Sequence, residues 1–418
     1  MPDDFYPPSP AVVVAIFLLT YLGMAVGRVP GLRIDRTGIG LIAAILLVAT
    51  GAITEERIVE AIDFPTIIIL FGLMILSAQF AASGFYDWCS LRIATAKGSP
   101  AQLLAFTIAG TGGLSAILVN DVVVFAMAPL LVAGLRGRSL DPRPYLIGLA
   151  GAANAGSAAT IIGNPQNIVI GQVGQLDFWS FLAVCGVPAM VALLCVYGTV
   201  WLMWRRRWHL PEQQVEPLPP ERLDLPHLVK AALCAALLLV FFASPLPDET
   251  GVLLVAGAIL ISRRLTSRQM LGMVDWQLLV LFVSLFIVTD AITGTGLPAL
   301  AVDALAQAGL LPDRLAVMAP LALVASNTTG NVPAVLLLLS VWPEMSEGAL
   351  YALALLTTLA GNLLLIGSLA NLIVAERALV AGVRLGFLEH ARCGLPMTLL
   401  SFAFALAWLW LMGMLPAF

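Results

Sequence analysis

Four clusters of polar residues interrupt otherwise apolar stretches of the chain. They lie at residues 111–121, 154–167, 326–333 and 357–371. Asn, Ser and Thr side chains supply neutral hydrogen-bond donors and acceptors. Glycines and Pro165 weaken or remove helix hydrogen bonds, so carbonyls become free to hold a cation and helix N-termini become free to hold an anion. The clusters therefore have the chemistry of a binding site for a small polar solute or ion.

The polar side chains of these clusters are the candidate substrate-binding residues. A sodium ion would find oxygen ligands near Gly163, Asn164, Gly367 and Asn371. Small and polar residues also join membrane helices without binding any solute, but their recurrence at related positions in both halves favours a binding site. The candidate set is Asn120, Asn154, Ser157, Thr160, Asn164, Asn167, Asn327, Thr328, Asn331, Thr358, Asn362, Ser368 and Asn371.

Asp121 is the one acid in the four clusters. An ionisable residue at membrane depth is costly and marks a functional site, so we predict that Asp121 carries the coupling proton. The alternative is that its carboxylate caps a helix by accepting backbone N–H bonds. Asp290 is a second deep acid, near the end of a span, and either has a function or only forms the helix exit.

The clusters contain no Lys or Arg, which favours a neutral or singly charged substrate, or one accompanied by sodium. His209, His227 and His390 fall in charged connecting segments, and the five cysteines show no paired spacing. We therefore predict no catalytic residue, no metal centre and no cofactor.

The composition places these clusters in a membrane. Hydrophobic residues make up 60% of the 418 positions and charged residues 11%, with a mean hydropathy of +0.97. Soluble domains have about 45–50% apolar and about 25% charged residues, so lipid must cover this surface. The net charge of −4 offers no basic footprint for nucleic acid.

Apolar runs of the length needed to cross a bilayer recur along the chain. Two further runs, 99–135 and 297–343, are interrupted by polar residues and glycines, and we interpret them as re-entrant hairpins. Two spans, 144–170 and 348–375, contain polar clusters and are predicted to be broken helices. The predicted spans are 10–27, 38–53, 64–83, 144–170, 178–204, 227–243, 250–262, 275–293, 348–375 and 396–417.

The Lys and Arg residues fix the orientation of these spans, because cytoplasmic loops are enriched in them. With both termini outside, all but two of the 21 bases fall inside. Arg57 and Arg314 are the exceptions. This sorting requires both hairpins to return to the face they enter from, and it predicts a multi-pass protein of the bacterial inner membrane.

The two halves of the chain match at offsets of 204 to 213 residues. Residues 35–38 match 248–251, and the segment 162–169 matches 366–373. Each half has five spans and one hairpin, so the second half must be inverted in the membrane, as in secondary transporters. The fold class is therefore all-α, with inverted repeats at 1–204 and 227–418 joined by a cytoplasmic linker at 205–226.

The stretches 153–167, 118–121 and 330–333 resemble those of the ion transporter superfamily. This superfamily groups arsenite efflux pumps, divalent-anion/sodium symporters, citrate transporters and plant silicon efflux transporters. The chain is most similar to the arsenite, silicon-efflux and bacterial anion-permease branch. The resemblance implies a scaffold part and a transport part in each repeat, and a homodimer. Dicarboxylate symporters have Ser-Asn-Thr at both hairpin tips, whereas here residues 326–328 match and 115–117 do not.

The expected function is secondary active transport of a small oxyacid or inorganic anion of the silicic acid or arsenite type, exchanged for protons, and the chain is not expected to be an enzyme. The alternatives are a sodium-coupled symporter of citrate, a dicarboxylate or sulfate, and an ion channel or membrane receptor. The expected partners are the solute, the coupling ion H⁺ or Na⁺ and the lipid bilayer, without nucleic acid.

Overall fold

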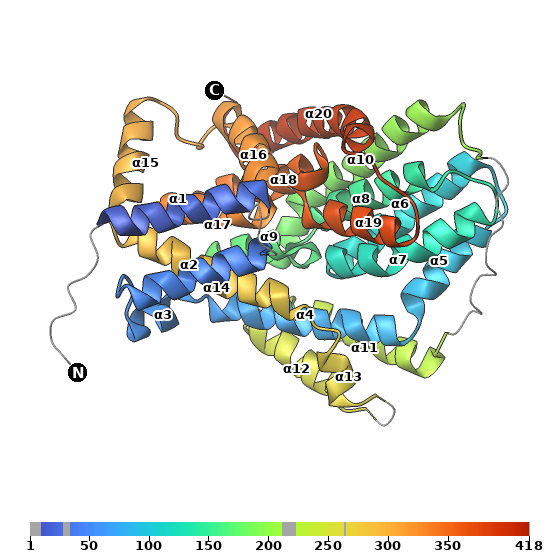
Figure 1. Ribbon diagram of the computed structural model, residues 1–418, viewed down its shortest axis with the longest axis horizontal. Helices are drawn as coiled ribbons and strands as arrows, with labels where there is room; N and C mark the ends of the chain where they lie inside the picture. Colours follow the sequence, from blue (N-terminus) through green and yellow to red (C-terminus); the bar gives the residue numbers. More distant parts are fainter. Residues whose placement is uncertain (1–9, 28–33, 211–222, 263–264, 418) are drawn as a thin grey trace.

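The computed structural model describes residues 10–27, 34–210, 223–262 and 265–417. Within these ranges the regular structure consists of helices, and the fold is all-α as predicted. Figure 1 shows α1 and α2 side by side at the left, with α7, α8 and α19 gathered toward the right. The predicted positions of Arg28, Arg33, Arg222, Arg263 and Arg264, of the N-terminus and of most of the linker lie outside the described residues.

The first half contains ten α-helices and one short 3-10 turn, η1. They are α1 (Pro10–Val26), α2 (Arg36–Ala49), α3 (Glu55–Ala61), α4 (Phe64–Ala82), α5 (Phe85–Thr95), α6 (Pro100–Ile117), α7 (Asn120–Arg136), α8 (Pro142–Ser157), η1 (Ile161–Gly163), α9 (Pro165–Val173) and α10 (Phe178–Trp204).

The second half follows in the same order, from α11 to α20 with a 3-10 turn, η2. Its elements are α11 (Leu225–Phe241), α12 (Asp248–Leu260), α13 (Ser267–Leu271), α14 (Trp276–Thr293), α15 (Leu297–Gln307), α16 (Leu315–Thr329), α17 (Asn331–Val341), α18 (Glu347–Ala360), η2 (Leu365–Gly367), α19 (Leu369–Val380) and α20 (Phe387–Leu411).

Four helices, α2, α4, α12 and α14, pack across the boundary between the two halves, and we call them the scaffold helices. Helix α2 packs on α14, and α12 packs on α4. A Cβ atom on Gly40 would lie 3.4 Å from Ser284 Cβ, and one on Gly72 would collide with Val252. Gly40 and Val252, like Gly72 and Ser284, are 212 positions apart, so the same crossing is built twice with exchanged partners.

The hairpins differ from the sequence prediction in one respect. The first, predicted at 99–135, is α6 and α7, which turn at Leu118 and Val119. The second was predicted at 297–343, but α15 is a separate helix and the hairpin is α16 and α17, turning at Gly330. Left-handed Gly296 and Gly309 bound α15, and these glycines interrupt an apolar run that looks continuous. Short helices α3, α5 and α13 are further elements that the span prediction missed.

The helices begin where the sequence supplies capping groups. Asp35, Asp63, Asp177 and Asp275 each accept a backbone N–H of the first turn that follows them, which satisfies donors without an intrahelical partner. Asn164 does the same for α9 by accepting from the Asn167 N–H at 2.9 Å. The second part of the broken helix can therefore begin in the middle of the protein.

Contacts between distant loops divide the connections into two faces. Arg136 Nη1 and Nη2 donate to the carbonyls of Ala381 and Gly382 on the first face, where the N–H of Asp224 also donates to the Ser83 carbonyl. On the opposite face, the Leu315 N–H donates to the Pro416 carbonyl. Each of these contacts joins two loops that the charge sorting places on one side, and the assignment of the loops to two faces stays a prediction.

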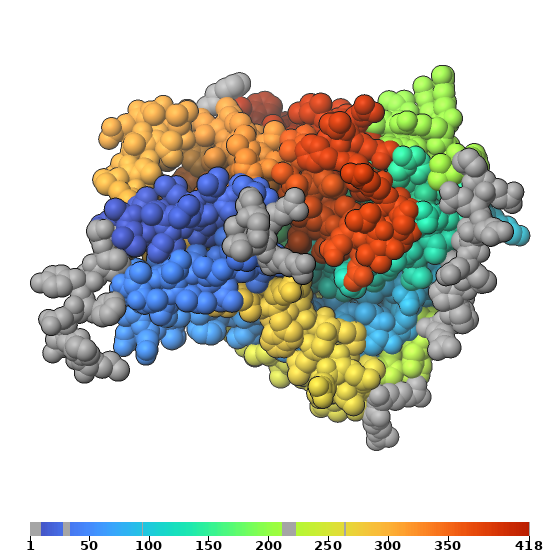
Figure 2. Space-filling model, in the orientation of Figure 1, coloured from blue at the N-terminus to red at the C-terminus, as the bar shows by residue number. Residues whose placement is uncertain are grey.

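The surface of the bundle is apolar where lipid would cover it. Among the described residues, five helices are long and apolar enough to cross a membrane, namely α4, α6, α10, α14 and α20. Leu18, Leu19 and Leu22 of α1 and Ile45 of α2 are exposed, on helices that form an open surface at the left of Figure 2. A surface of such residues marks a region that lipid or another protein covers.

The crossing of α6 and α8 yields a stability prediction. A Cβ atom on Gly156 would collide with the backbone of Gly112, which is not free to move aside. We expect Gly156→Ala to destabilise the protein by about 1–3 kcal/mol through overpacking, measured as a lower thermal midpoint in detergent. Gly113 is adjacent to Gly112 and has open space around the position of a Cβ atom. Gly113→Ala is therefore the matched control and should not lower the midpoint. Equal midpoints for both variants would contradict this account of the crossing.

Candidate functional site

The two broken helices meet in a buried node around Asn154. Asn154 Nδ2 donates to Asn362 Oδ1 at 2.9 Å and to Asn371 Oδ1 at 3.1 Å. The Ser368 hydroxyl donates to Asn154 Oδ1 at 2.8 Å. Asn371 in turn donates to the carbonyls of Gly361 and Leu364, which the break in the helix leaves free. One residue of the first half therefore connects three predicted residues of the second.

A second group of hydrogen bonds surrounds Thr358. Its hydroxyl accepts from Asn164 Nδ2 at 3.3 Å and donates to Asn167 Oδ1 at 3.3 Å. Asn164 Nδ2 also donates to Ser157 Oγ at 3.1 Å, and Asn167 donates to the carbonyls of Ser157 and Thr160. These residues are buried, so the network holds the unwound backbone between α8 and α9 in place.

The second hairpin is attached to this network through two asparagines. Asn327 Nδ2 donates to the Ala360 carbonyl at 2.9 Å, and its Oδ1 accepts from the Leu364 N–H. With its amide nitrogen facing carbonyls, Asn331 donates to the oxygens of Thr357 and Gly367 and accepts from Gln166 Nε2. At the corresponding place in the first half, the Thr160 hydroxyl donates to the Ala116 carbonyl at 2.6 Å.

Two predicted site residues are not in this network. Thr328 is exposed, and its hydroxyl donates to the carbonyls of Val324 and Ala325 in its own helix. It faces away because side chains one residue apart on a helix point in different directions. Asn120 lies at the first hairpin tip, buried, and its Oδ1 has no hydrogen-bond partner among the described residues.

The two deep acids have different surroundings. Asp290 forms a bidentate pair with Arg57, at 2.8 and 2.9 Å, which identifies it as a tie between α14 and α3. Asp121 is buried beside Asn120, and no hydrogen bond to its carboxylate is found within the described ranges. It therefore does not cap α7, as the alternative interpretation required. Asp275 lies close enough for the two carboxylates to repel each other.

Each hairpin also places one hydroxyl without a partner near the break in the following helix. Ser115 Oγ and Ser326 Oγ are buried, and neither has a hydrogen-bond partner in the part of the chain described. A Cβ atom on Gly163 would lie 2.9 Å from the Ser115 carbonyl, and one on Gly367 would lie 2.5 Å from Asn327 Oδ1. Oxygens converge at both glycines, which fits the predicted sodium positions in type of ligand.

Three residues of interest were not predicted. Gln166 links Thr358 and Asn331. His390 is not in a charged connection as predicted but fully buried in α20, with Nε2 3.3 Å from the Asn362 carbonyl. Arg36 brings a base to the second hairpin tip, since its Nη1 lies 3.4 Å from the position of a Cβ on Gly330. Gln166 lies within the predicted polar cluster 154–167 and could have been included there. His390 and Arg36 contact residues of other segments, and no local signal marks such contacts.

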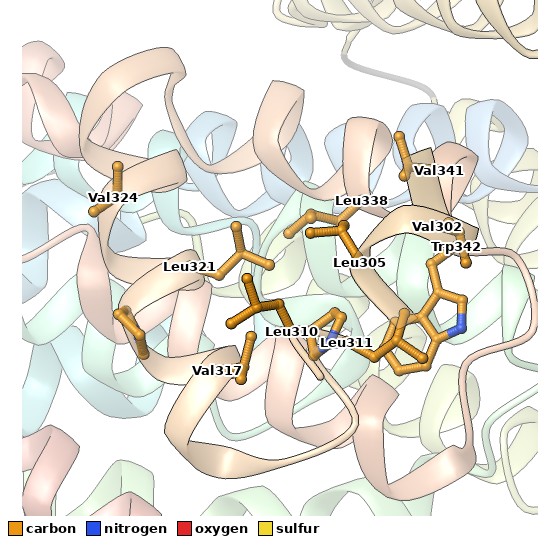
Figure 3. Close-up of a pocket in the computed structure, with 12 residues that line it drawn as sticks. Val302, Leu305, Leu310, Leu311, Val317, Leu321, Val324, Leu338, Val341 and Trp342 are labelled. Atoms are coloured by element: carbon orange, nitrogen blue, oxygen red, sulfur yellow. The ribbon is translucent and has the colours of Figure 1, made fainter. Parts of the chain in front are cut away.

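Two cavities lie away from the network. The first, of about 440 Å³, is lined by apolar side chains of α15, α16 and α17 and the loop between α15 and α16, including Leu310, Leu321 and Trp342, as Figure 3 shows. A polar solute would lose its hydration there without gaining hydrogen bonds. The second, of about 380 Å³, has Asp177 and Glu347 in its lining, and these acids would repel an anion.

Known proteins resemble this chain along almost its whole length. A transporter of Mycobacterium bovis is 27% identical over 96% of this chain and 98% of its own. The silicon efflux transporter LSI3 of Oryza sativa subsp. japonica is 27% identical, over 89% of this chain and 91% of its own. The crystal structure of the YdaH transporter of Alcanivorax borkumensis, described as having an unusual topology, matches with a TM-score of 0.56 at 14% identity. That match covers 97% of this chain and 98% of the other, so the fold is that of a membrane transporter.

The family comparison agrees with the resemblance inferred from the polar clusters. The model of the citrate transporter family matches residues 17–356. This range contains both hairpins, the first broken helix and the scaffold helices. The chain is a multi-pass membrane protein and belongs to the citrate transporter family of the ion transporter superfamily.

Proposed function

We propose that this protein is a secondary active transporter of the bacterial inner membrane that moves a small oxyacid, of the silicic acid or arsenite type, in exchange for protons. The single observation that carries the proposal is Asp121, a buried carboxylate at a hairpin tip that neither caps a helix nor forms an ion pair among the described residues. The silicon efflux relative favours this class of solute.

Exchange follows from competition for that carboxylate. A neutral oxyacid has hydroxyl groups that donate hydrogen bonds, and a carboxylate accepts them. Protonation of Asp121 removes its charge and part of its capacity to accept, so proton and oxyacid exclude each other. In an inverted-repeat carrier the site opens to one side at a time. The site therefore carries the oxyacid in one direction and the proton in the other, which is exchange.

Sodium-coupled uptake of citrate, a dicarboxylate or sulfate is the second candidate. Ser115 Oγ and Ser326 Oγ favour it, because two buried hydroxyls without partners lie at related positions beside converging oxygens. A coupling Na⁺ would satisfy both. The absence of Ser-Asn-Thr at residues 115–117 argues against it, as does the presence of an acid at only one hairpin tip.

Flux measurements in proteoliposomes test the proposal. Uptake and efflux of silicic acid, arsenous acid, sulfate and citrate should be measured while pH and sodium gradients are imposed independently. We expect an imposed pH gradient to drive uphill movement of silicic or arsenous acid. Uphill movement driven only by sodium would support the second candidate, and flux that no gradient drives uphill would indicate a channel.

Asp121→Asn should abolish proton-driven uphill flux, because an amide keeps the shape of the carboxylate but cannot take up a proton at physiological pH. Asp121→Glu should retain a measurable part of it. Asp303→Asn, which changes an exposed acid on α15, is the control and should behave as the wild type. If Asp121→Asn retains proton-driven flux, Asp121 is not the carrier.

Asn154→Leu should abolish transport and destabilise the protein. The substitution leaves the Ser368 hydroxyl and the Oδ1 atoms of Asn362 and Asn371 without the partner that Asn154 provides, at about 1–3 kcal/mol for each buried group. Thr328→Val is the control, since Thr328 bonds only within its own helix. Flux and thermal midpoint measured together should both fall for Asn154→Leu and stay constant for Thr328→Val, and the reverse order would exclude the Asn154 node from the site.

A further inference from the structure

We propose that Arg36 is a further substrate contact, contributed by the scaffold helix α2 and effective only while the hairpin tips lie at the N-terminal ends of α2 and α14. The inference rests on the proposed function, since it names a second contact for the same oxyacid. Its ligand class is a small oxyacid with several hydroxyl groups, which can accept hydrogen bonds from a guanidinium and donate them to a carboxylate.

Arg36 has the geometry of a prepared donor. Its Nε donates to the Met24 carbonyl at 3.2 Å, which fixes the guanidinium and leaves Nη1 and Nη2 without hydrogen-bond partners among the described residues. The side chain is half-buried. Gly330 lies beside Nη1 and has a φ of +94°, so the tip approaches the guanidinium without a side chain between them.

Both hairpin tips meet this same end of the scaffold. The Tyr21 hydroxyl donates to the Pro333 carbonyl at 3.2 Å, which holds the second tip against α1. The Thr37 hydroxyl donates to the Gln277 carbonyl at 3.4 Å, so the N-terminal ends of α2 and α14 adjoin. Asp275, the residue before α14, lies close enough to Asp121 of the first tip for the two carboxylates to repel each other. Arg36 therefore supplies donors at the scaffold end where Asp121 supplies an acceptor.

The neighbouring charges leave the guanidinium available. Asp35 and Asp275 accept the N–H groups of Gly38 and Leu278, at 2.9 and 3.0 Å, and cap their own helices. Neither acid forms an ion pair with Arg36 within the described ranges.

The opposite end of the scaffold has the opposite charge. The crossing of α12 and α4 repeats that of α2 and α14 at an offset of 212 positions, which makes Asp248 the equivalent of Arg36. The sequence match of 35–38 to 248–251 makes the equivalent Glu249 instead. The equivalent of Asp275 is Asp63. When alternating access carries the hairpin tips to that end, the oxyacid finds carboxylates that can accept its hydrogen bonds but no guanidinium that donates to it. The affinity for substrate should therefore be higher on the side of Arg36, which the charge sorting identifies as cytoplasmic.

Sided flux measurements on the full chain test this inference. The protein is reconstituted in known orientation, and the KM for silicic acid and for arsenous acid is measured from each side. We expect Arg36→Gln to raise the KM on the Arg36 side about tenfold or more, as loss of hydrogen bonds to a charged group predicts, with little change on the other side. Arg36→Lys should be intermediate, because it keeps the charge but not the planar fork.

The controls separate the outcomes. Arg314→Gln, at the opposite face, should leave both KM values unchanged, and Asp248→Asn with Glu249→Gln should leave the KM on the Arg36 side unchanged. If the wild type moves no member of the panel, the proposed function fails. If the wild type transports but Arg36→Gln or the folded Arg36→Lys shows unchanged KM values, or an equal rise on both sides, Arg36 has only a structural role and the inference is overturned.

Discussion

The fold depends on one constraint, that backbone groups freed inside a membrane must find partners within the protein. The two broken helices expose carbonyls at Ser157, Thr160, Gly361 and Leu364, and asparagine amides satisfy each of them. The same side chains also bond across the halves, because Asn371 Oδ1 accepts from Asn154 and Asn167 Oδ1 accepts from Thr358. Satisfying the breaks therefore joins the repeats, and neither broken helix is complete without the other half.

This constraint also separates the rigid part of the site from the part free to bind. In the network around Asn154 and Thr358 nearly every polar atom has a partner, so a solute could enter only by displacing existing hydrogen bonds. Among the described residues, buried polar atoms without partners occur in several helices, and those nearest the breaks lie in the hairpins, at Thr111, Ser115, Asn120 and Ser326. Buried polar groups without partners are costly, and a bound solute or ion would remove that cost. A solute or ion would therefore bind at the hairpins more readily than within the asparagine network.

The sequence was sufficient for features that depend on local chemistry. Gly, Pro and Asn break a helix wherever they cluster, so both broken helices and both turns were predictable, as was the all-α membrane class. Contacts between distant segments were not. Arg57 pairs with Asp290 across 233 positions, His390 is buried against Asn362, and Arg36 reaches Gly330, although each looks like an ordinary residue of its own segment. The prediction that the Thr328 side chain points into the site was wrong. The sequence also did not reveal α15 as a separate helix, because it lies in a continuous apolar run.

In a fold built of two repeats, the energy difference between the inward-open and outward-open arrangements comes from the positions at which the two repeats differ in sequence. If the backbone of one half repeats the other in inverted form, two identical halves would make the inward- and outward-open arrangements equal in energy. The tips here differ, since Asp121 follows Asn120 but Val332 follows Asn331. The scaffold ends also differ, since the positions equivalent to Arg36 in the second repeat are Asp248 and Glu249. These few positions change charge, while the asparagine network that they surround is neutral. The shared network can therefore keep the site intact in both arrangements, and the unmatched charges give the two arrangements different affinities for proton and solute.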